Sequence, residues 1–157
     1  MGGVGMPNAI ERLLADHKMI RKTLEVFHRD NPRYGLIRET LHRIVLGHAW
    51  FEDEILLPAL RNEPLLERRL TDEIIQEHKD IAHLLKLIQK TSPDQERQWA
   101  PLALQLRVIL ETHFRKEEDA LFPLAERILR SEGLIELSTQ MEKRKMEVHD
   151  LLNKVVT

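Results

Sequence analysis

The sequence contains no cysteine, few aromatic residues and no excess of one kind of charge. Without cysteine the chain forms no disulfide, holds no thiolate-ligated cluster and offers no thiol nucleophile, so any metal site must use histidine and carboxylate ligands. The 24 Lys and Arg nearly balance the 26 Asp and Glu, which leaves a formal charge of -2. The basic surface that binds nucleic acid is therefore not expected.

Long apolar runs are also missing. The longest contain only a few residues, and residues 1–14 lack the charged and then apolar pattern of a signal peptide. We therefore expect a cytoplasmic protein that does not associate with a membrane. At 157 residues, of which 42% are hydrophobic, the chain has the size and composition of one domain with a buried core.

Hydrophobic residues recur at spacings of three and four, and no alternating, strand-like run appears, so the sequence predicts an all-α fold. Breaks rich in Gly, Pro and Asn divide it into four long helices with short connections, which predicts an antiparallel up-down-up-down four-helix bundle. The expected long helices span about residues 8–30, 36–61, 65–90 and, after a cap at Ser92-Pro93, up to about 130. Pro101 either kinks the fourth helix or marks its start.

A fifth, weakly amphipathic helix is expected after Gly133. It carries the apolar residues Leu134, Leu137, Met141, Val148 and Leu152. The resulting division has residues 1–7 disordered, residues 8–131 in the bundle and residues 132–157 in the extra C-terminal helix. Two arrangements are open for that helix: it packs on the bundle, or it pairs with a second copy of the chain in a homodimer.

The expected second and fourth helices contain an internal repeat. Residues 48–58 and residues 113–123 both follow the pattern H-x-x-x-E-[DE]-[DE]-x-L-[LF]-P. The expected first and third helices share a shorter match, DHKMI at residues 16–20 and EHKDI at residues 77–81. We infer two similar helical hairpins, each with one helix of either type.

Eight histidines outnumber the Phe (4), Trp (2) and Tyr (1) residues together. On a helix, the residues three and four positions before a histidine share its face. Only aliphatic residues occupy those positions before His17, His48, His78 and His113. Glu52 and Glu117 lie one turn after His48 and His113 on the same faces. Charged residues precede the others, so we expect a surface or rim position for His28, His42, His83 and His149.

A lone histidine on an apolar face is most often a hydrogen-bonded core residue. Four imidazoles and two carboxylates in one bundle interior, however, would carry a large burial cost without compensation. Metal binding removes that cost, because imidazole suits iron, copper, zinc and nickel, and bridging carboxylates suit two neighbouring metals. Two histidines on each metal, both glutamates bridging and a solvent-derived oxo or hydroxo bridge would give five ligands. An octahedral shell then keeps one position open, which is typical of redox or sensing centres and not of closed structural sites.

The remaining repeat positions have more ordinary roles. We expect core packing for Leu56, Leu57, Leu121 and Phe122. The acidic residues that follow each glutamate point about 120–140° away from the ligand faces of an α-helix, so we expect them in solvent. They are Asp53, Glu54, Glu118 and Asp119.

With these motifs the sequence resembles the hemerythrin-like, HHE cation-binding family over about residues 8–130. The resemblance implies an antiparallel four-helix bundle with a non-haem di-iron centre, that is, two Fe joined by oxo or hydroxo and carboxylate bridges. It also implies the iron ligands His17, His48, Glu52, His78, His113 and Glu117.

Two positions differ from the oxygen-carrying hemerythrins. Ala82 stands where those proteins have a second histidine on the third helix, and the fourth helix has H-x-x-x-E in place of a longer His-to-Asp spacing. The pattern is nearer to the bacterial and iron-sensing branches. The Cys-containing N-terminal domain of the related di-iron repair proteins is absent from this sequence.

Two functions are open on this evidence: a protein that binds or senses oxygen, nitric oxide or iron, and a di-iron oxidase or peroxidase acting on oxygen or hydrogen peroxide. A ferritin-like oxidase ranks lower. This sequence has two Glu-x-x-His motifs, Glu25 to His28 and Glu39 to His42, but both point away from the apolar helix faces that carry the other histidines. Arg21 and Lys116 lie one turn after His17 and His113, and each either guides anions to the site or forms ion pairs.

Overall fold

The computed structural model describes residues 5, 7–66 and 68–156, with side chains described up to residue 145. All regular structure within these ranges is helical, which confirms the all-α prediction. The expectation of disorder for residues 1–7 falls mostly outside the described residues. The side chains of Val148, His149 and Leu152 lie outside them as well.

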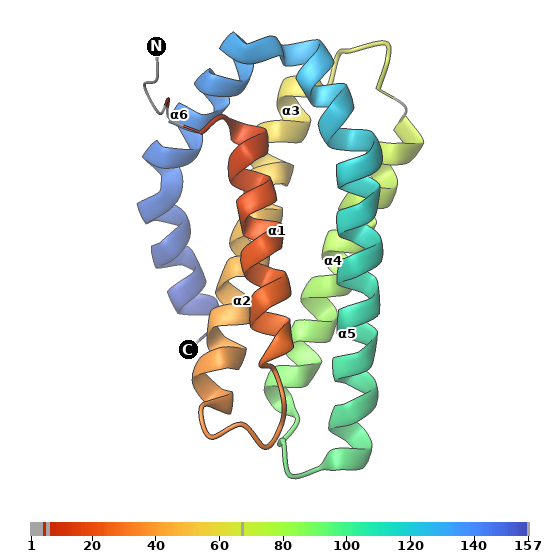
Figure 1. Ribbon diagram of the computed structural model, residues 1–157, viewed down its shortest axis with the longest axis vertical. Helices are drawn as coiled ribbons and strands as arrows, with labels where there is room; N and C mark the ends of the chain where they lie inside the picture. Colours follow the sequence, from red (N-terminus) through yellow and green to blue (C-terminus); the bar gives the residue numbers. More distant parts are fainter. Residues whose placement is uncertain (1–4, 6, 67, 157) are drawn as a thin grey trace.

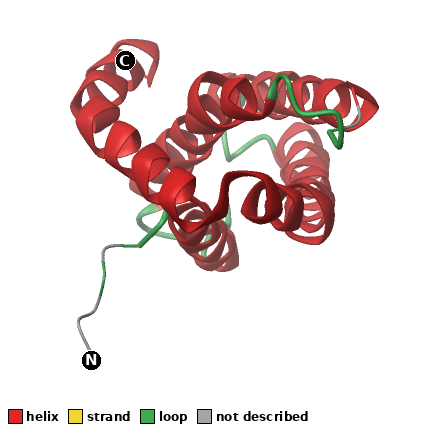
Figure 2. Cartoon of the chain, turned by 90° about the horizontal axis from the view of Figure 1, so that it is seen from above, coloured by secondary structure: helices red, strands yellow, loops and turns green. Residues whose placement is uncertain are grey.

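Four helical rods make up the bundle (Figure 1). The first is α1 (Ala9–Glu25), and the second joins α2 (Tyr34–Phe51), the π-helical turn η1 (Glu52–Leu56) and α3 (Leu57–Leu60). The third is α4 (Arg68–Lys90), and the fourth runs from α5 (Glu96–Lys116) through the π-helical turn η2 (Glu117–Leu121) into α6 (Phe122–Val156). Successive rods run in opposite directions along the long axis, and the last part of α6 lies at one side of the bundle (Figures 1 and 2).

Helix α1 begins where the sequence indicates and ends earlier. Asn8 caps it, and the reciprocal bonds between Asn8 and Glu11 form a capping box. The helix stops at Glu25, not near residue 30, and a side chain from a distant helix binds the backbone carbonyls on either side of that end. The Arg107 guanidinium donates to the carbonyls of Leu24 and Phe27 at 2.7 and 2.6 Å.

Two other expected boundaries also move. Helix α5 starts at Glu96, and Pro101 lies inside it without marking its start. The break near residue 130 is present, but Arg130 makes it, with φ 56°, and Gly133 does not have positive φ. A β-carbon at position 133 would lie 3.1 Å from the Leu129 Cβ. Close packing against Leu129 therefore accounts for the glycine.

Two hydrophobic clusters fill the bundle, one toward each end. The first includes the predicted core residues Leu56, Leu57, Leu121 and Phe122, and it also takes in Leu134, Leu137 and Met141 of α6. The second joins α1, α2, α4 and α5 around Phe27, Trp99 and Phe114. The prediction of core packing for the four repeat residues is confirmed. Between the two clusters lie the six predicted metal ligands, which we call the seam residues: His17, His48, Glu52, His78, His113 and Glu117.

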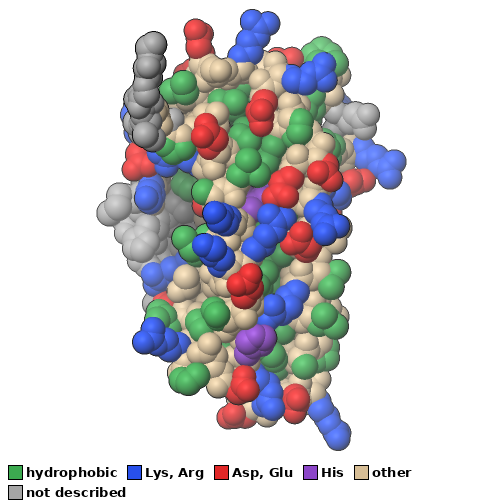
Figure 3. Space-filling model, in the orientation of Figure 1, with side chains coloured by type: hydrophobic (Ala, Val, Ile, Leu, Met, Phe, Trp, Pro, Cys, Tyr) green, Lys and Arg blue, Asp and Glu red, His purple; other side chains and the backbone are tan. Residues whose placement is uncertain are grey.

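The outer surface mixes both signs of charge. Figure 3 shows acidic and basic side chains interspersed over the face formed by α1 and α5. Among the described residues, no helix combines the length and the apolar character that a membrane crossing requires.

Candidate metal centre

The six seam residues come together in the middle of the bundle. None exposes more than 6% of its surface, and Glu52 and Glu117 expose none. His17 comes from α1, His48 from α2, His78 from α4 and His113 from α5, and the two glutamates open the π-helical turns. This convergence places four imidazoles and two carboxylates in a water-poor interior.

The imidazoles form two pairs. The Nε2 atoms of His17 and His48 lie 3.1 Å apart, and those of His78 and His113 also lie 3.1 Å apart. Each pair joins the two helices of one hairpin, so the packing of those helices sets the spacing. All four Nε2 atoms face the interior, where the two donors of each pair are close enough to share one cation.

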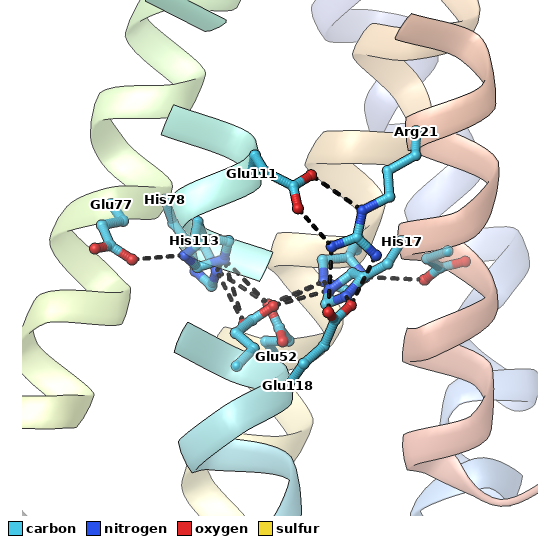
Figure 4. A network of polar contacts seen from close by, with 11 residues as sticks. His17, Arg21, Glu52, Glu77, His78, Glu111, His113 and Glu118 are labelled. Carbon is cyan, nitrogen blue, oxygen red and sulfur yellow. Dashed lines mark hydrogen bonds and ion pairs between the residues drawn. The ribbon is translucent and has the colours of Figure 1, made fainter. Parts of the chain in front are cut away.

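Glu117 reaches both pairs with different oxygens. Its Oε1 lies 3.0 Å from Nε2 of His17, and its Oε2 lies 3.3 Å from Nε2 of His113. Glu52 also lies between the pairs, with Oε1 at 3.2 Å from Nε2 of His48 and 3.0 Å from Nε2 of His78. Both carboxylates therefore lie between the two histidine pairs. Figure 4 shows Glu52 in this position.

Two carboxylate oxygens at the centre have no partner with hydrogen-bond geometry in the described part of the chain. They are Oε2 of Glu52 and Oε2 of Glu117, and both are buried. Glu117 Oε2 lies 3.3 Å from Nε2 of His113 but without hydrogen-bond geometry, so both oxygens are poorly compensated acceptors. A buried acceptor of this kind is costly, and a cation is the simplest group that would satisfy it. The possible ligand atoms also lie close together in two groups, each within 4.8 Å of one another. The first group is Glu52, His78, His113 and Glu117, and the second is His17, His48 and Glu117. The residues present fit a metal centre.

A second set of carboxylates holds the outward-facing nitrogens of the same histidines. The Nδ1 atom of His17 lies 2.7 Å from Glu118, that of His48 3.1 Å from Asp16, that of His78 2.7 Å from Asp53 and that of His113 2.7 Å from Glu77. We call Asp16, Asp53, Glu77 and Glu118 the outer carboxylates. An Nδ1–H that donates to a carboxylate leaves the Nε2 lone pair directed inward and makes the imidazole a stronger ligand.

The outer carboxylates correct one expectation and add two residues. Asp53 and Glu118 were expected in solvent, but each contacts a seam histidine. Asp16 and Glu77 were missed, although the matching dipeptides Asp16-His17 and Glu77-His78 were a usable signal. Each of these two residues binds the histidine of a neighbouring helix, which helix periodicity alone does not reveal.

The π-helical turns explain why Asp53 and Glu118 face inward. In η1 the Leu57 N–H bonds to the Glu52 carbonyl, five residues back, and in η2 the Phe122 N–H bonds to the Glu117 carbonyl. A turn of this width rotates less per residue than an α-helix, so the residue after each glutamate stays nearer the bundle side. The proline that ends each repeat lacks an N–H, which allows the return to α-helical bonding at that point.

The histidines outside the seam are placed less uniformly than expected. His28 and His83 are exposed, as predicted. The prediction for His42 is wrong, because only 4% of its surface is exposed. Burial and the nearby Arg38 lower the pKa of His42 and keep its ring neutral. The two Glu-x-x-His motifs form no cluster: His28 bonds to the backbone carbonyl of Glu25, and Glu39 pairs with Arg43.

Arg21 and Lys116 form ion pairs, which was one of the two roles considered for them. Arg21 contacts Glu111 and Glu118, and Lys116 contacts Glu73 and Glu77. Glu77 and Glu118 are both outer carboxylates, so each cation is one contact removed from a seam histidine.

In the absence of metal, neighbouring carboxylates raise the pKa of His48, His78 and His113. Burial disfavours the charged rings, but Asp53 and Glu52 outweigh it and raise the pKa of His78 to about 9. Glu117 and Glu52 likewise raise the pKa of His113 to about 10. At neutral pH the metal-free site is therefore held together by imidazolium–carboxylate pairs.

We expect the melting temperature of the metal-free protein to fall as the pH rises from about 6.5 toward about 10. An unfolded histidine has a pKa of about 6.5, below the folded values for His78 and His113. Their contribution to stability is fully present below the unfolded pKa and is lost as the pH rises through the folded pKa. Melting curves of chelator-treated protein across this range test the expectation.

The matched variants are His78→Gln with His113→Gln, which should flatten the profile, and His83→Gln, which should leave it unchanged. A metal-free wild type that melts at the same temperature throughout this range would contradict the assignment of charge to these rings.

The comparison with known families matches the part of the chain that carries the seam residues. Residues 8–125, and in a second match residues 69–157, fit the family model of the hemerythrin HHE cation binding domain. The segment 69–125 belongs to both matches, as the internal repeat allows. The chain matches no curated protein and no solved structure. The first match alone covers well over half of the sequence, and the chain belongs to the hemerythrin HHE cation-binding domain family.

Proposed function

We propose that this protein holds two iron ions in the six-residue centre and uses them to bind or sense oxygen, nitric oxide or iron. The observation that carries the proposal is the equal division of the donors: two histidine Nε2 atoms on each side and two carboxylates between them. His17, His48, Glu52 and Glu117 would hold one ion, and His78 and His113 would hold the other with the same two glutamates. Iron bound there would supply one-electron chemistry and open coordination positions for a small ligand.

The chain itself prepares the site in three ways. The outer carboxylates hold all four imidazoles with Nε2 inward. Glu52 and Glu117 bring negative charge that balances two cations in a buried position. The Phe114 ring stacks on His17 with centroids 3.9 Å apart and helps to exclude water.

Burial of the centre favours a small ligand. All six residues are at least nine-tenths buried, so an organic substrate would have to displace packed side chains to reach them. Oxygen, nitric oxide and hydrogen peroxide are small enough to reach such a site through fluctuations of the bundle. This supports diatomic ligands or peroxide over a larger substrate.

The near-equal halves of the centre argue against reversible oxygen transport. Ala82, one turn after His78, offers no donor, so each side has two histidines. A reversible oxygen carrier would need two unequal metal positions, and the described residues would hold each ion with the same number of histidines. Binding or sensing is therefore favoured over carriage.

We expect the iron-loaded, anaerobically reduced protein to contain two iron ions per chain and to be oxidised by oxygen without releasing oxygen again under vacuum. Nitric oxide should bind the reduced form readily. Iron analysis and stopped-flow absorbance with each gas test this, and the surface variant His83→Ala should behave as wild type. Reversible oxygenation would contradict the proposal.

The alternative function, an oxidase or peroxidase, differs from a binding or sensing role because an enzyme turns over its substrate repeatedly. Such an enzyme would consume oxygen or hydrogen peroxide repeatedly in the presence of a reductant, whereas a binding or sensing protein would react once for each centre. An oxygen electrode with a reductant in excess separates them. Sustained consumption by wild type that is lost in Glu117→Gln would support the enzyme and overturn the binding role.

A further inference from the structure

The four outer carboxylates fall into two classes. Glu118 and Glu77 each pair with a basic side chain, Arg21 and Lys116 respectively. Among the residues with described side chains, neither Asp16 nor Asp53 forms an ion pair with Lys or Arg. Each histidine pair therefore contains one ring, His17 or His113, held by a carboxylate that is paired with a cation. The carboxylate on the other ring contacts no Lys or Arg among the described side chains.

Arg21 shares an acceptor atom with a seam histidine. Its Nη1 donates to Oε2 of Glu118 at 2.9 Å, and the same oxygen lies 2.7 Å from Nδ1 of His17. The guanidinium also donates to Oε1 of Glu118 at 3.2 Å and to Glu111 at 3.1 Å. The contact with Glu118 is bidentate, which fixes the carboxylate plane and withdraws charge from the oxygen that accepts from His17 (Figure 4).

Lys116 repeats the arrangement on the other side of the centre. Its ammonium contacts Oε2 of Glu77, whose Oε1 accepts from Nδ1 of His113, and lies 3.2 Å from Glu73. Burial of the side chains increases inward along the contacts, from 40% exposed at Glu73 to 19% at Glu77 and 1% at His113. The partners of Arg21 show the same trend, from 45% exposed at Glu111 to 26% at Glu118. The internal repeat does not account for this parallel, because it aligns Arg21 with Ala82 and Lys116 with Phe51.

A cation paired with an outer carboxylate affects the divalent and trivalent states of a bound metal differently. An uncompensated carboxylate draws the Nδ1 proton toward itself, which increases electron donation from Nε2 to the metal. A cation on that carboxylate reduces the donation and also repels the metal charge directly. Both effects disfavour the trivalent state more than the divalent state.

We propose that Arg21 and Lys116 are positioning residues that act through Glu118 and Glu77 to weaken electron donation by His17 and His113 and to raise the reduction potential of the bound metal. The inference rests on the proposed metal centre. It assigns these residues to the metal site, beyond a role in joining α1, α4 and α5. If Arg21 and Lys116 only supported the structure of the site, their replacement would weaken metal binding, because loss of an outer partner commonly lowers metal affinity about 10–100-fold. The proposal predicts tighter binding instead.

The test compares Arg21→Met and Lys116→Met with two matched controls. Arg115→Met removes a cation that contacts Glu111 but not Glu118, and Arg69→Met removes one that contacts Glu73 but not Glu77. The probe is cobalt(II), which is expected to bind such a site at least as tightly as iron(II). We expect Arg21→Met and Lys116→Met each to bind cobalt(II) several-fold more tightly, because the site becomes one charge more negative, while both controls match wild type.

A second measurement uses the iron-loaded protein. The midpoint potential should shift to lower values in Arg21→Met and Lys116→Met, stay unchanged in the controls and be largely restored in Arg21→Lys, which keeps the charge. Weaker cobalt(II) binding in the Met variants, an equal shift in the controls, or Arg21→Lys behaving as Arg21→Met would each overturn the inference. If wild type held no iron, the proposed function would fail, and the cobalt(II) affinities would still decide this inference.

Discussion

Glu117→Gln is expected to abolish binding at both metal positions, whereas His17→Ala should remove metal from one. Glu117 directs one oxygen toward His17 and the other toward His113, so it serves both sides of the centre. Its replacement removes a buried negative charge that the two proposed ions would share, and we expect metal affinity to fall by more than the ~100-fold that follows loss of an outer-sphere partner. His17 contributes its Nε2 atom to one histidine pair only.

Elemental analysis of metal-reconstituted protein after desalting measures the stoichiometry. Asp119→Asn is the matched control, because it removes one carboxylate from the same π-helical turn at a position that is exposed, as the sequence predicts. Retention of full metal by Glu117→Gln, or equal loss in Asp119→Asn, would show that the seam residues are not the ligands. Circular dichroism would verify that the variants remain helical.

Removal of metal should lower the melting temperature by about 10 °C at neutral pH. A ligand present at about 1,000 times its Kd stabilises a protein by about 4 kcal/mol, and a chain of this size shifts by about 2–4 °C per kcal/mol. Without metal, the buried oxygens of Glu52 and Glu117 lose the partner that would offset their burial. The imidazolium–carboxylate pairs of the metal-free form replace part of this stabilisation, so the loss should grow as the pH rises.

Thermal melts with and without a chelator measure the difference. The control is the same chelator on Glu117→Gln, which is expected to hold no metal and should melt at an unchanged temperature. A wild type whose melting temperature does not respond to chelation would contradict the coupling of metal binding to stability.

Several features could be predicted because they depend on residues close together in the chain. Helical periodicity identified the all-α fold, and the aliphatic neighbours of four histidines identified the residues that meet in the interior. The same rule failed at His42, because a residue preceded by Arg38 and Glu39 is buried here by packing between helices. The early end of α1 was also missed, and the carbonyls at that end bind Arg107, which is far away in the sequence.

The internal repeat and the spacing of His and Glu determined which side chains face the bundle interior, because an α-helix places residues three and four apart on one face. Only the tertiary structure decided what surrounds those side chains. The π-helical turns bring Asp53 and Glu118 inward, and Asp16 and Glu77 reach across to histidines of neighbouring helices. These contacts depend on how the rods pack and on hydrogen bonds five residues apart, and neither is encoded in the periodicity of a single helix.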